Sequence, residues 1–153
     1  LRHRMPVTVR RRVGTHLWLG GADAYRYTSS VTDVHQVSRG ERVGYWQRAV
    51  PDPRGGQVVV VDGGTSHGVA MSAPTPGASV RQQLTAAAGG LLNASRLALS
   101  PFSIGGRKRF FVEPPHMQAS LVWVPGGVNV TVGAEIDVTM RATTATPDAI
   151  VLE

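Results

Sequence analysis

The most constraining feature of the sequence is an uninterrupted run of four valines at 58–61, followed directly by Asp62, Gly63 and Gly64. β-Branched side chains favour an extended backbone, and a continuous apolar run of this length is typical of a strand buried on both faces. Glycine permits a backbone path that most residues cannot follow, so the run should end abruptly. The segment therefore predicts a buried β-strand that leads into a glycine turn.

Shorter signals of the same kind recur along most of the chain. Valines alternate with polar neighbours near the N-terminus, which predicts one or two strands over 6–19. Arg39 and Gly40 indicate a turn within a strand-rich stretch at 31–50, and prolines and glycines at 51–56 indicate a hairpin-like loop. Later strands are expected over 109–113, 121–124, 128–132, 135–141 and 150–152.

One segment, residues 79–99, is rich in alanine and leucine instead. Ser79 and Gln82 have the spacing of a capping box, and an apolar stripe of helical period follows them. Gly89 and Gly90 end or divide this helix, because a glycine costs about 1 kcal/mol in a helix interior. The expected fold class is therefore all-β: a barrel-like β-domain with one helical insertion around 79–99.

The composition narrows the class of protein further. A chain of 153 residues suits one domain, residues 1–153, with a substantial buried core. It has no cysteine, which excludes disulfides, iron–sulfur clusters, zinc ribbons and thiol nucleophiles. It has neither an apolar run long enough to span a membrane nor the apolar core of a signal peptide. We therefore expect a cytoplasmic domain, and the first residue, Leu1, suggests a piece of a longer protein.

The net charge of +6 raises the question of nucleic-acid binding. All but one of the 16 basic residues are arginine, as an arginine-biased codon pool would give without selection for binding. Five arginines cluster near the N-terminus: Arg2, Arg4, Arg10, Arg11 and Arg12. No aromatic stripe, zinc finger or helix-turn-helix pattern accompanies them. Nucleic acid is therefore not expected to be the partner.

The histidines and one serine are weak candidates for chemistry. Four of the five histidines are spread along the chain: His16, His35, His67 and His116. They lack carboxylates at ligand spacing, so no metal site is expected. Ser66 lies in a Gly-x-Ser-x-Gly pattern, but a nucleophile elbow needs a helix directly after the serine. Pro74 and Pro76 leave no room for that helix, so a hydrolase is not expected.

Tyr45 is a stronger candidate, since it stands between Gly44 and Trp46 at the entrance of a predicted strand. An ordinary phenol is protonated at neutral pH, so a tyrosine that acts as a general base needs positive charge or hydrogen bonds to stabilise the phenolate. Arg42 and Arg48 are close in sequence. The alternative is an aromatic residue that packs at a barrel rim, and spacing alone does not decide between the two.

Taken in order, four segments resemble the C-terminal β-domain of the alanine racemases, which are fold-type III PLP enzymes. VHQVSRGERVGYWQRAV (34–50) is similar to their strand and turn with the G-x-x-V-[SG]-Y-G tyrosine. VVVVDGGTSHGVAM (58–71) is similar to the next strand and its GYADG turn. VEPPHMQASLVWV (112–124) is similar to VGR-x-SMDQ-x-x-VDV, which places Met117 on the methionine, and TVGAEIDVTM (131–140) is similar to the VGDEV strand. The match covers about 34–152.

The resemblance implies a role in amino-acid racemisation. It implies that Tyr45 is a catalytic base on one face of the substrate, while a lysine of a separate N-terminal (β/α)8 barrel binds PLP and serves the other face. It implies that the backbone near Met117 binds the substrate carboxylate. It also implies a head-to-tail homodimer, in which the β-domain of one subunit closes the active site of its partner.

Several positions depart from the family pattern. Thr65 stands in place of a tyrosine, His67 in place of the turn aspartate, and Gln118 in place of the aspartate beside the methionine. These departures leave open whether the parent protein acts on alanine or on another amino acid. A β-domain of a related PLP decarboxylase or D-threonine-aldolase-like enzyme is one alternative. A non-catalytic β-barrel that binds a protein or nucleic acid is another.

The only lysine, Lys108, is expected in a glycine-flanked hairpin, which is a solvated turn and not a desolvated Schiff-base pocket. The chain alone is therefore not expected to bind PLP covalently or to be active.

Overall fold

The computed structural model describes residues 24–45, 47–49, 54–71 and 98–152. These residues form eight strands and one short 3-10 turn. In chain order, the elements are β1 (Tyr27–Val37), β2 (Arg42–Val43), β3 (Arg48–Ala49), β4 (Gly56–Asp62), η1 (Thr65–His67), β5 (Leu99–Ile104), β6 (Arg107–Phe111), β7 (Ala119–Pro125) and β8 (Glu135–Val138).

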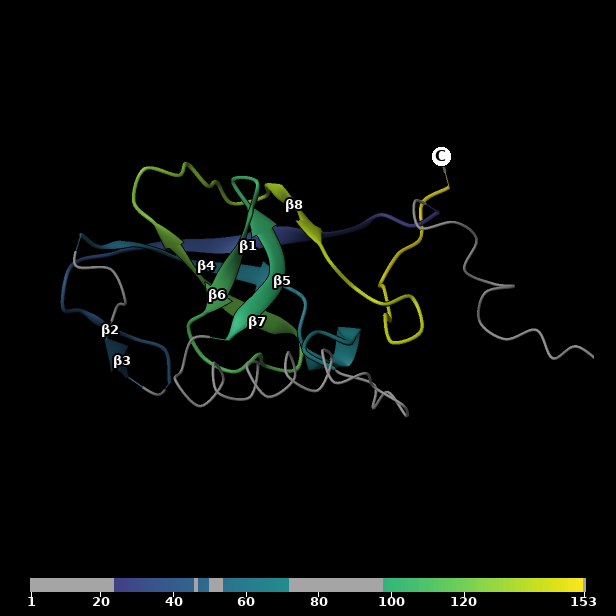
Figure 1. The fold of residues 1–153 in the computed structure, drawn as a ribbon, viewed down its shortest axis with the longest axis horizontal. Coiled ribbons are helices and arrows are strands. Elements are labelled where there is room, and N and C mark those ends of the chain that lie inside the picture. The colour runs from purple at the N-terminus through teal and green to yellow at the C-terminus, as the bar shows by residue number, and fades with distance from the viewer. Residues whose placement is uncertain (1–23, 46, 50–53, 72–97, 153) are drawn as a thin grey trace, which may run out of the picture.

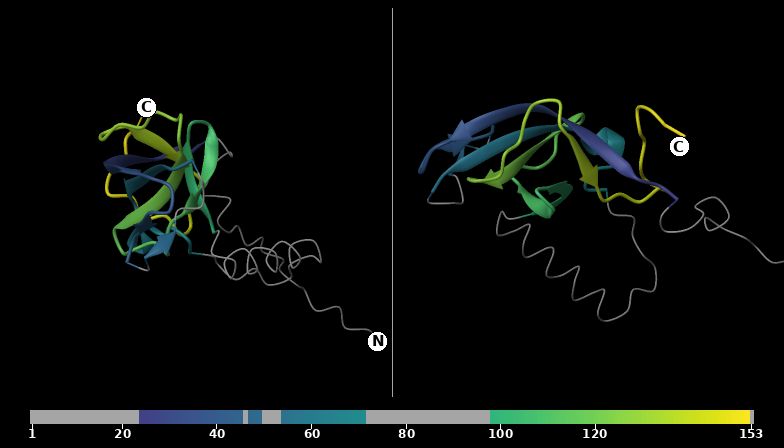
Figure 2. Two further views of the ribbon diagram at one scale, coloured as in Figure 1. Left: turned by 90° about the vertical axis from the view of Figure 1, so that its left-hand side faces the viewer. Right: turned by 90° about the horizontal axis from the view of Figure 1, so that it is seen from above.

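Six of the strands close into a barrel in the order β1-β4-β7-β6-β5-β8. Every neighbouring pair is antiparallel, and the pairing of Tyr27 with Val138 joins β8 back to β1. Figures 1 and 2 show the strands curving around a common interior. Closure removes the unpaired edges that an open sheet would expose. The predicted all-β, barrel-like fold is confirmed.

β4 is buried on both faces, as its valine run predicts. Val59 and Val61 point into the barrel, where they belong to the main core. That core also contains Val31, Val69, Phe102, Ile104, Phe111, Val122, Val124, Ile136 and Val138. Val58 points to the opposite face and packs with Val37, Val112 and Trp123 in a second cluster. Alternate side chains of one strand therefore stabilise two separate apolar clusters.

The short hairpin of β2 and β3 covers the second cluster. The two strands pair Arg42 with Ala49 and Val43 with Arg48, and Val43 packs against the outer cluster. Figure 1 shows this hairpin beside the barrel, close to the end of β1. Strands of this length are not stable as an isolated hairpin, so contacts with the barrel must hold this one in place.

Several predicted element boundaries agree with the structure. Arg39 and Gly40 form a turn, and Gly40 has a positive φ of 78°. β4 ends at Asp62, directly before the glycine pair. Gly105 and Gly106 form the turn between β5 and β6, again with positive φ.

Other predicted strands are wrong. Residues 128–132 and 150–152 are not strands, and β8 ends at Val138 instead of continuing to 141. Val128 and Val130 still pack partly against the main core, so their apolar side chains reflect loop packing and not strand pairing. β6 begins two residues earlier than expected and stops at Phe111, which places Glu113 in the following loop.

One strand was missed. β5 contains Pro101, and a proline lowers the expectation of a strand because it lacks an N–H. Leu99, expected as the last residue of the helical insertion, begins β5 instead. The rest of that predicted helix up to residue 97, and the predicted strands over 6–19, lie outside the described residues. Among the described residues, no helix has the length and apolar character needed to cross a membrane.

The core makes a direct prediction about stability. Phe102 is fully buried and packs edge-to-face on Phe111, so Phe102→Ala should lower the free energy of unfolding by about 3–5 kcal/mol. Phe110→Ala on β6 is the matched control, because that ring is 38% exposed, and its cost should be less than half as large. Urea denaturation of the two variants and the wild type measures the difference. Equal losses would contradict the assignment of Phe102 to the core.

Candidate functional site

The segments with Tyr45 and Thr65, which the sequence analysis singles out, both contact the loop that contains Met117. This loop, residues 112–118, connects β6 to β7. Its first part contacts the turn at 44–47, between β2 and β3, and its last part contacts the turn at 63–68, after β4. Figure 1 shows the loop along the same side of the barrel as η1. The segments with Tyr45, Thr65 and Met117 are therefore neighbours in the fold.

Backbone hydrogen bonds join the loop to the turn after β4. The amide of Gly63 donates to the Gln118 carbonyl at 2.8 Å, Thr65 to His116 at 2.9 Å, and Ser66 to Met117 at 2.9 Å. Gly64 allows this close approach, because a Cβ there would clash with the carbonyl oxygens of His116 and Met117. The turn and the loop form one rigid unit as a result.

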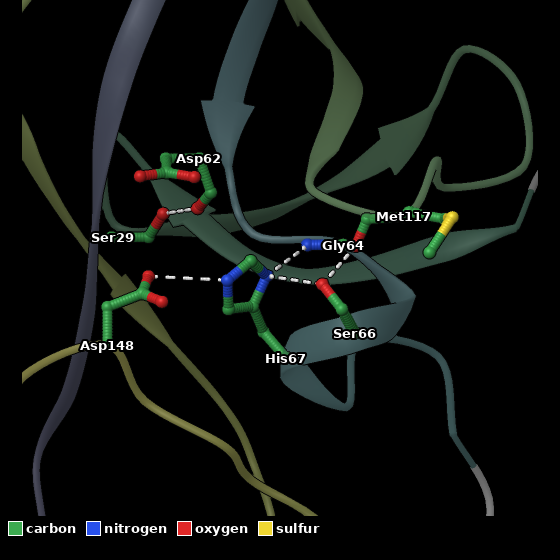
Figure 3. Close-up of polar contacts among 7 residues, drawn as sticks. All are labelled: Ser29, Asp62, Gly64, Ser66, His67, Met117 and Asp148. Carbon is green, nitrogen blue, oxygen red and sulfur yellow. Dashed lines mark hydrogen bonds and ion pairs between the residues drawn. The ribbon is translucent and has the colours of Figure 1, made fainter.

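Ser66, His67 and Asp148 lie in a row that resembles a catalytic triad in composition (Figure 3). Ser66 Oγ lies 3.3 Å from His67 Nδ1, and His67 Nε2 lies 3.2 Å from Asp148 Oδ2. However, the Gly64 N–H donates to His67 Nδ1 at 3.1 Å, so Nδ1 is an acceptor and Nε2 carries the proton. Ser66 Oγ donates its own proton to the Met117 carbonyl.

This arrangement does not activate Ser66. A nucleophilic serine must donate its proton to a free imidazole nitrogen, whereas here the serine proton is bonded to a carbonyl and Nδ1 already accepts an amide. His67 instead holds the segment that follows β8. Its carbonyl accepts from the Thr146 amide at 3.2 Å, and its ring faces Asp148. The His67 side chain is thus structural in this fold.

Tyr45 and Met117, the two predicted site residues, are both strongly exposed. Tyr45 is 89% exposed in the turn between β2 and β3, and Met117 is 74% exposed in the 112–118 loop. The amide of Tyr45 donates to Glu113 Oε2 at 2.7 Å, which ties the turn to the loop. The structure therefore brings the two segments together and leaves both side chains pointing to solvent.

Glu113 and His116 are the residues that sequence reasoning missed. The Glu113 side chain is only 3% exposed, and its Oε1 lies 2.7 Å from His116 Nε2. The sequence contains these two residues at a Glu-x-x-His spacing, which would have indicated that they can contact each other. The pair was missed because Glu113 was expected to be the last residue of a strand over 109–113. Because the chain leaves β6 at Phe111, Glu113 turns toward the Tyr45 turn instead.

The described histidines all contact a carboxylate, contrary to the expectation from spacing. His35 lies 2.9 Å from Asp33, and the other two contact Asp148 and Glu113. Each contact involves a single carboxylate. In the part of the chain that the structure describes, no group of three or more potential ligands could hold a metal ion.

Two cavities open beside the turn after β4. One has a volume of about 310 Å³ and is lined by Tyr27, Asp62, His67 and Asp148, among others. Burial, with a smaller contribution from Tyr25, raises the pKa of Tyr27. The other cavity, of about 370 Å³, includes Lys108 in its lining.

Lys108 is exposed on β6 and borders the second cavity. Lys108 lies within β6, opposite Ser103, and not in the turn where the sequence suggested it, but its side chain is exposed as expected. A Schiff-base lysine reacts as the neutral amine, which enzymes favour by desolvation or by a neighbouring cation. That the chain alone does not bind PLP at the exposed Lys108 stays a prediction.

No protein-family model and no curated protein matches the sequence. Among solved structures, the chain is similar to alanine racemases. The enzyme of Clostridium difficile 630 in complex with cycloserine has a TM-score of 0.49 and 13% identity over 78% of this chain and 25% of that chain. The alanine racemase of Acinetobacter baumannii has a TM-score of 0.47 and 15% identity over 74% of this chain and 25% of that chain. The biosynthetic alanine racemase of Pseudomonas aeruginosa has a TM-score of 0.46 and 18% identity over 73% of this chain and 25% of that chain. The chain spans about a quarter of the length of these proteins.

The contact between the turn and the loop can be tested at Gly64. Gly64→Ala should destabilise the protein by about 1–3 kcal/mol or more, because the new Cβ meets two backbone carbonyls that cannot rotate away. Gly126→Ala is the matched control, since neither glycine has a positive φ and the closest atom to a Cβ at Gly126 is 3.9 Å away. Thermal or urea unfolding compares the two variants. A Gly64→Ala protein as stable as Gly126→Ala would argue against the close approach.

Proposed function

We propose that this chain is the β-domain of a PLP-dependent, alanine-racemase-like enzyme that acts on an amino acid. The domain would complete an active site together with a (β/α)8 barrel elsewhere in a longer protein, in its own or a partner subunit. The observation that carries the proposal is the position of Tyr45. Its side chain is 89% exposed, while its backbone is fixed by the buried carboxylate of Glu113.

An exposed side chain on a fixed backbone suits a proton-transfer group. A tyrosine that only packed at the barrel rim would be covered by its neighbours. Tyr45 is not covered within the described chain, and so its ring can reach a substrate held by another domain. A general base must come within hydrogen-bond distance of the proton that it removes, and a fixed turn maintains that distance. We assign proton exchange at the substrate α-carbon to the Tyr45 hydroxyl.

Met117 fits the second role that the resemblance assigns. Hydrogen bonds from the Thr65 and Ser66 amides hold the backbone of the loop at His116 and Met117. A rigid backbone can present an amide donor to an anionic oxygen with little loss of entropy. We assign the backbone at Met117 to the substrate carboxylate. Its exposed side chain, with that of Tyr45, would be covered when the barrel docks.

PLP, bound to a lysine of the barrel, would supply the electron sink that makes the substrate α-proton acidic. The residues of this chain would bind and orient the substrate and move that proton. The parent would be a homodimer in the cytoplasm, in which each β-domain faces the barrel of the other subunit.

Replacing Tyr45 tests the proposed base directly. Tyr45→Phe keeps the ring and removes the ionisable oxygen, so activity of the full-length protein should fall by about 10²–10⁴-fold with little change in stability. The loss should be one-sided. Solvent deuterium should still enter the enantiomer whose α-proton is exchanged by the barrel lysine, while incorporation into the other enantiomer stops. Tyr25→Phe, an exposed tyrosine that stacks on Tyr27 of β1, is the control.

Undiminished deuterium incorporation into both enantiomers by the Tyr45→Phe protein would remove the catalytic role of Tyr45. Another group would then have to exchange the proton on that face. A full-length wild-type protein that incorporates no deuterium into either enantiomer would instead favour the alternative, a binding module without catalysis.

The exclusion of Lys108 from cofactor binding is a separate prediction. The full-length protein with Lys108→Arg should retain PLP as well as the wild type does, because the exposed lysine on β6 is not the Schiff-base residue. Borohydride reduction followed by peptide mapping locates the modified lysine. An adduct at Lys108 would show that the β-domain itself binds the cofactor.

A further inference from the structure

Glu113 is a buried carboxylate in which each oxygen has its own partner. Oε2 accepts the amide of Tyr45 at 2.7 Å, and Oε1 lies 2.7 Å from His116 Nε2. Burying a carboxylate is costly unless hydrogen bonds or an opposite charge compensate for the lost water. The two contacts give that compensation, and they also fix the orientation of the carboxylate.

The turn that carries Tyr45 is weakly held by its own strands. β2 and β3 have two residues each, and the bonds inside the turn close it on itself: Gln47 N–H to the Gly44 carbonyl at 3.1 Å, and Arg42 Nη1 to the Gln47 carbonyl at 3.0 Å. Val43 packs on the outer cluster below the turn. Among the described residues, the hydrogen bond that reaches the tip from outside the hairpin is the one from the Tyr45 amide to Glu113, and so this carboxylate sets the direction of the tip.

Gly44 shows how closely the carboxylate approaches the turn. Its φ is +74°, and a Cβ at this position would clash with Oε2 of Glu113. The carboxylate therefore lies against the backbone of Gly44 and Tyr45 together. Any side chain at position 44 would have to displace it.

The other oxygen connects the turn to the rest of the site. The His116 amide donates to the Ala119 carbonyl and its carbonyl accepts from the Thr65 amide, both at 2.9 Å. The backbone that carries the His116 ring is thus anchored to β7 and to the turn after β4. A continuous series of contacts runs from Thr65 through His116 and Glu113 to Tyr45.

We propose that Glu113, supported by His116, is the positioning residue for Tyr45: its buried carboxylate fixes the backbone of the turn and so the direction in which the phenol leaves the domain. The importance of this direction for catalysis rests on the proposed function of Tyr45. The positioning itself can be measured without any activity.

The first experiment is hydrogen exchange in the full-length protein. Glu113→Gln keeps the shape of the side chain and removes its charge, and so the Tyr45 amide should exchange roughly tenfold faster, as expected when a charge-assisted hydrogen bond becomes a neutral one. Mass spectrometry of peptides across residues 43–47 reports the rate. Glu135→Gln, an exposed glutamate on β8, is the charge-matched control and should leave the rate unchanged. Unchanged Tyr45 exchange in a folded Glu113→Gln protein would overturn the proposal.

A pair of glycine variants gives a second, independent measurement. Gly44→Ala and Gly40→Ala place the same methyl group on a positive-φ backbone, at +74° and +78°, but only the first meets Glu113. Gly44→Ala should accelerate exchange of the Tyr45 amide, and Gly40→Ala should not. Equal exchange rates in the two variants would overturn the proposal. This comparison tests the positioning of Tyr45 by Glu113 even if the Glu113→Gln protein fails to fold.

The catalytic consequence is read from deuterium incorporation. Glu113→Gln should reduce incorporation on the Tyr45 face by at least about tenfold and leave the opposite face unaffected, whereas a general loss of structure would reduce both. Equal reduction on both faces would contradict the positioning role. If Tyr45→Phe changes neither face while the Tyr45 amide still loses protection in Glu113→Gln, the proposed function fails and the positioning by Glu113 stands.

Discussion

The burial of β4 on both faces is the constraint on which the rest of the structure depends. Its odd-numbered valines stabilise the barrel interior, and Val58 stabilises the outer cluster under the β2–β3 hairpin. Both clusters need neighbours, so β4 pairs along its length with β1 and β7. Where the run ends, at Asp62, the backbone leaves the barrel in the glycine turn that meets the loop after β6. The candidate site thus begins where the core strand stops.

The 112–118 loop joins two separate turns, at 44–47 and at 63–68. Its last residues are fixed mainly by backbone hydrogen bonds from the turn after β4. Its first residues act through a side chain instead, since the Glu113 carboxylate accepts the Tyr45 amide. A single substitution can therefore loosen the Tyr45 turn while the opposite turn stays in place.

The contacts of His67 show that a serine, a histidine and an aspartate in a row need not form a catalytic triad. The His67 ring lies within contact distance of both Ser66 and Asp148, yet the imidazole nitrogen next to the serine already accepts an amide proton. His67 and Asp148 join the turn after β4 to the segment after β8, and Ser66 joins the same turn to the Met117 carbonyl. At the start of the 112–118 loop, the buried Glu113 contacts the exposed His116. This pair does not resemble a catalytic triad, yet Glu113 directly contacts the backbone of Tyr45, the predicted catalytic residue.

The sequence by itself determined the fold class, the double burial of β4 and the glycine turns, because these follow from local properties: β-branched side chains, alternation and positive-φ positions. It also singled out Tyr45 and Met117. It could not place β5, where Pro101 obscures the strand signal, or distinguish the loop valines Val128 and Val130 from strand residues. Only the tertiary structure decided that Glu113 meets the amide of Tyr45, 68 residues earlier in the chain. That contact depends on which loops the closed barrel brings together, and no local pattern of residues encodes it.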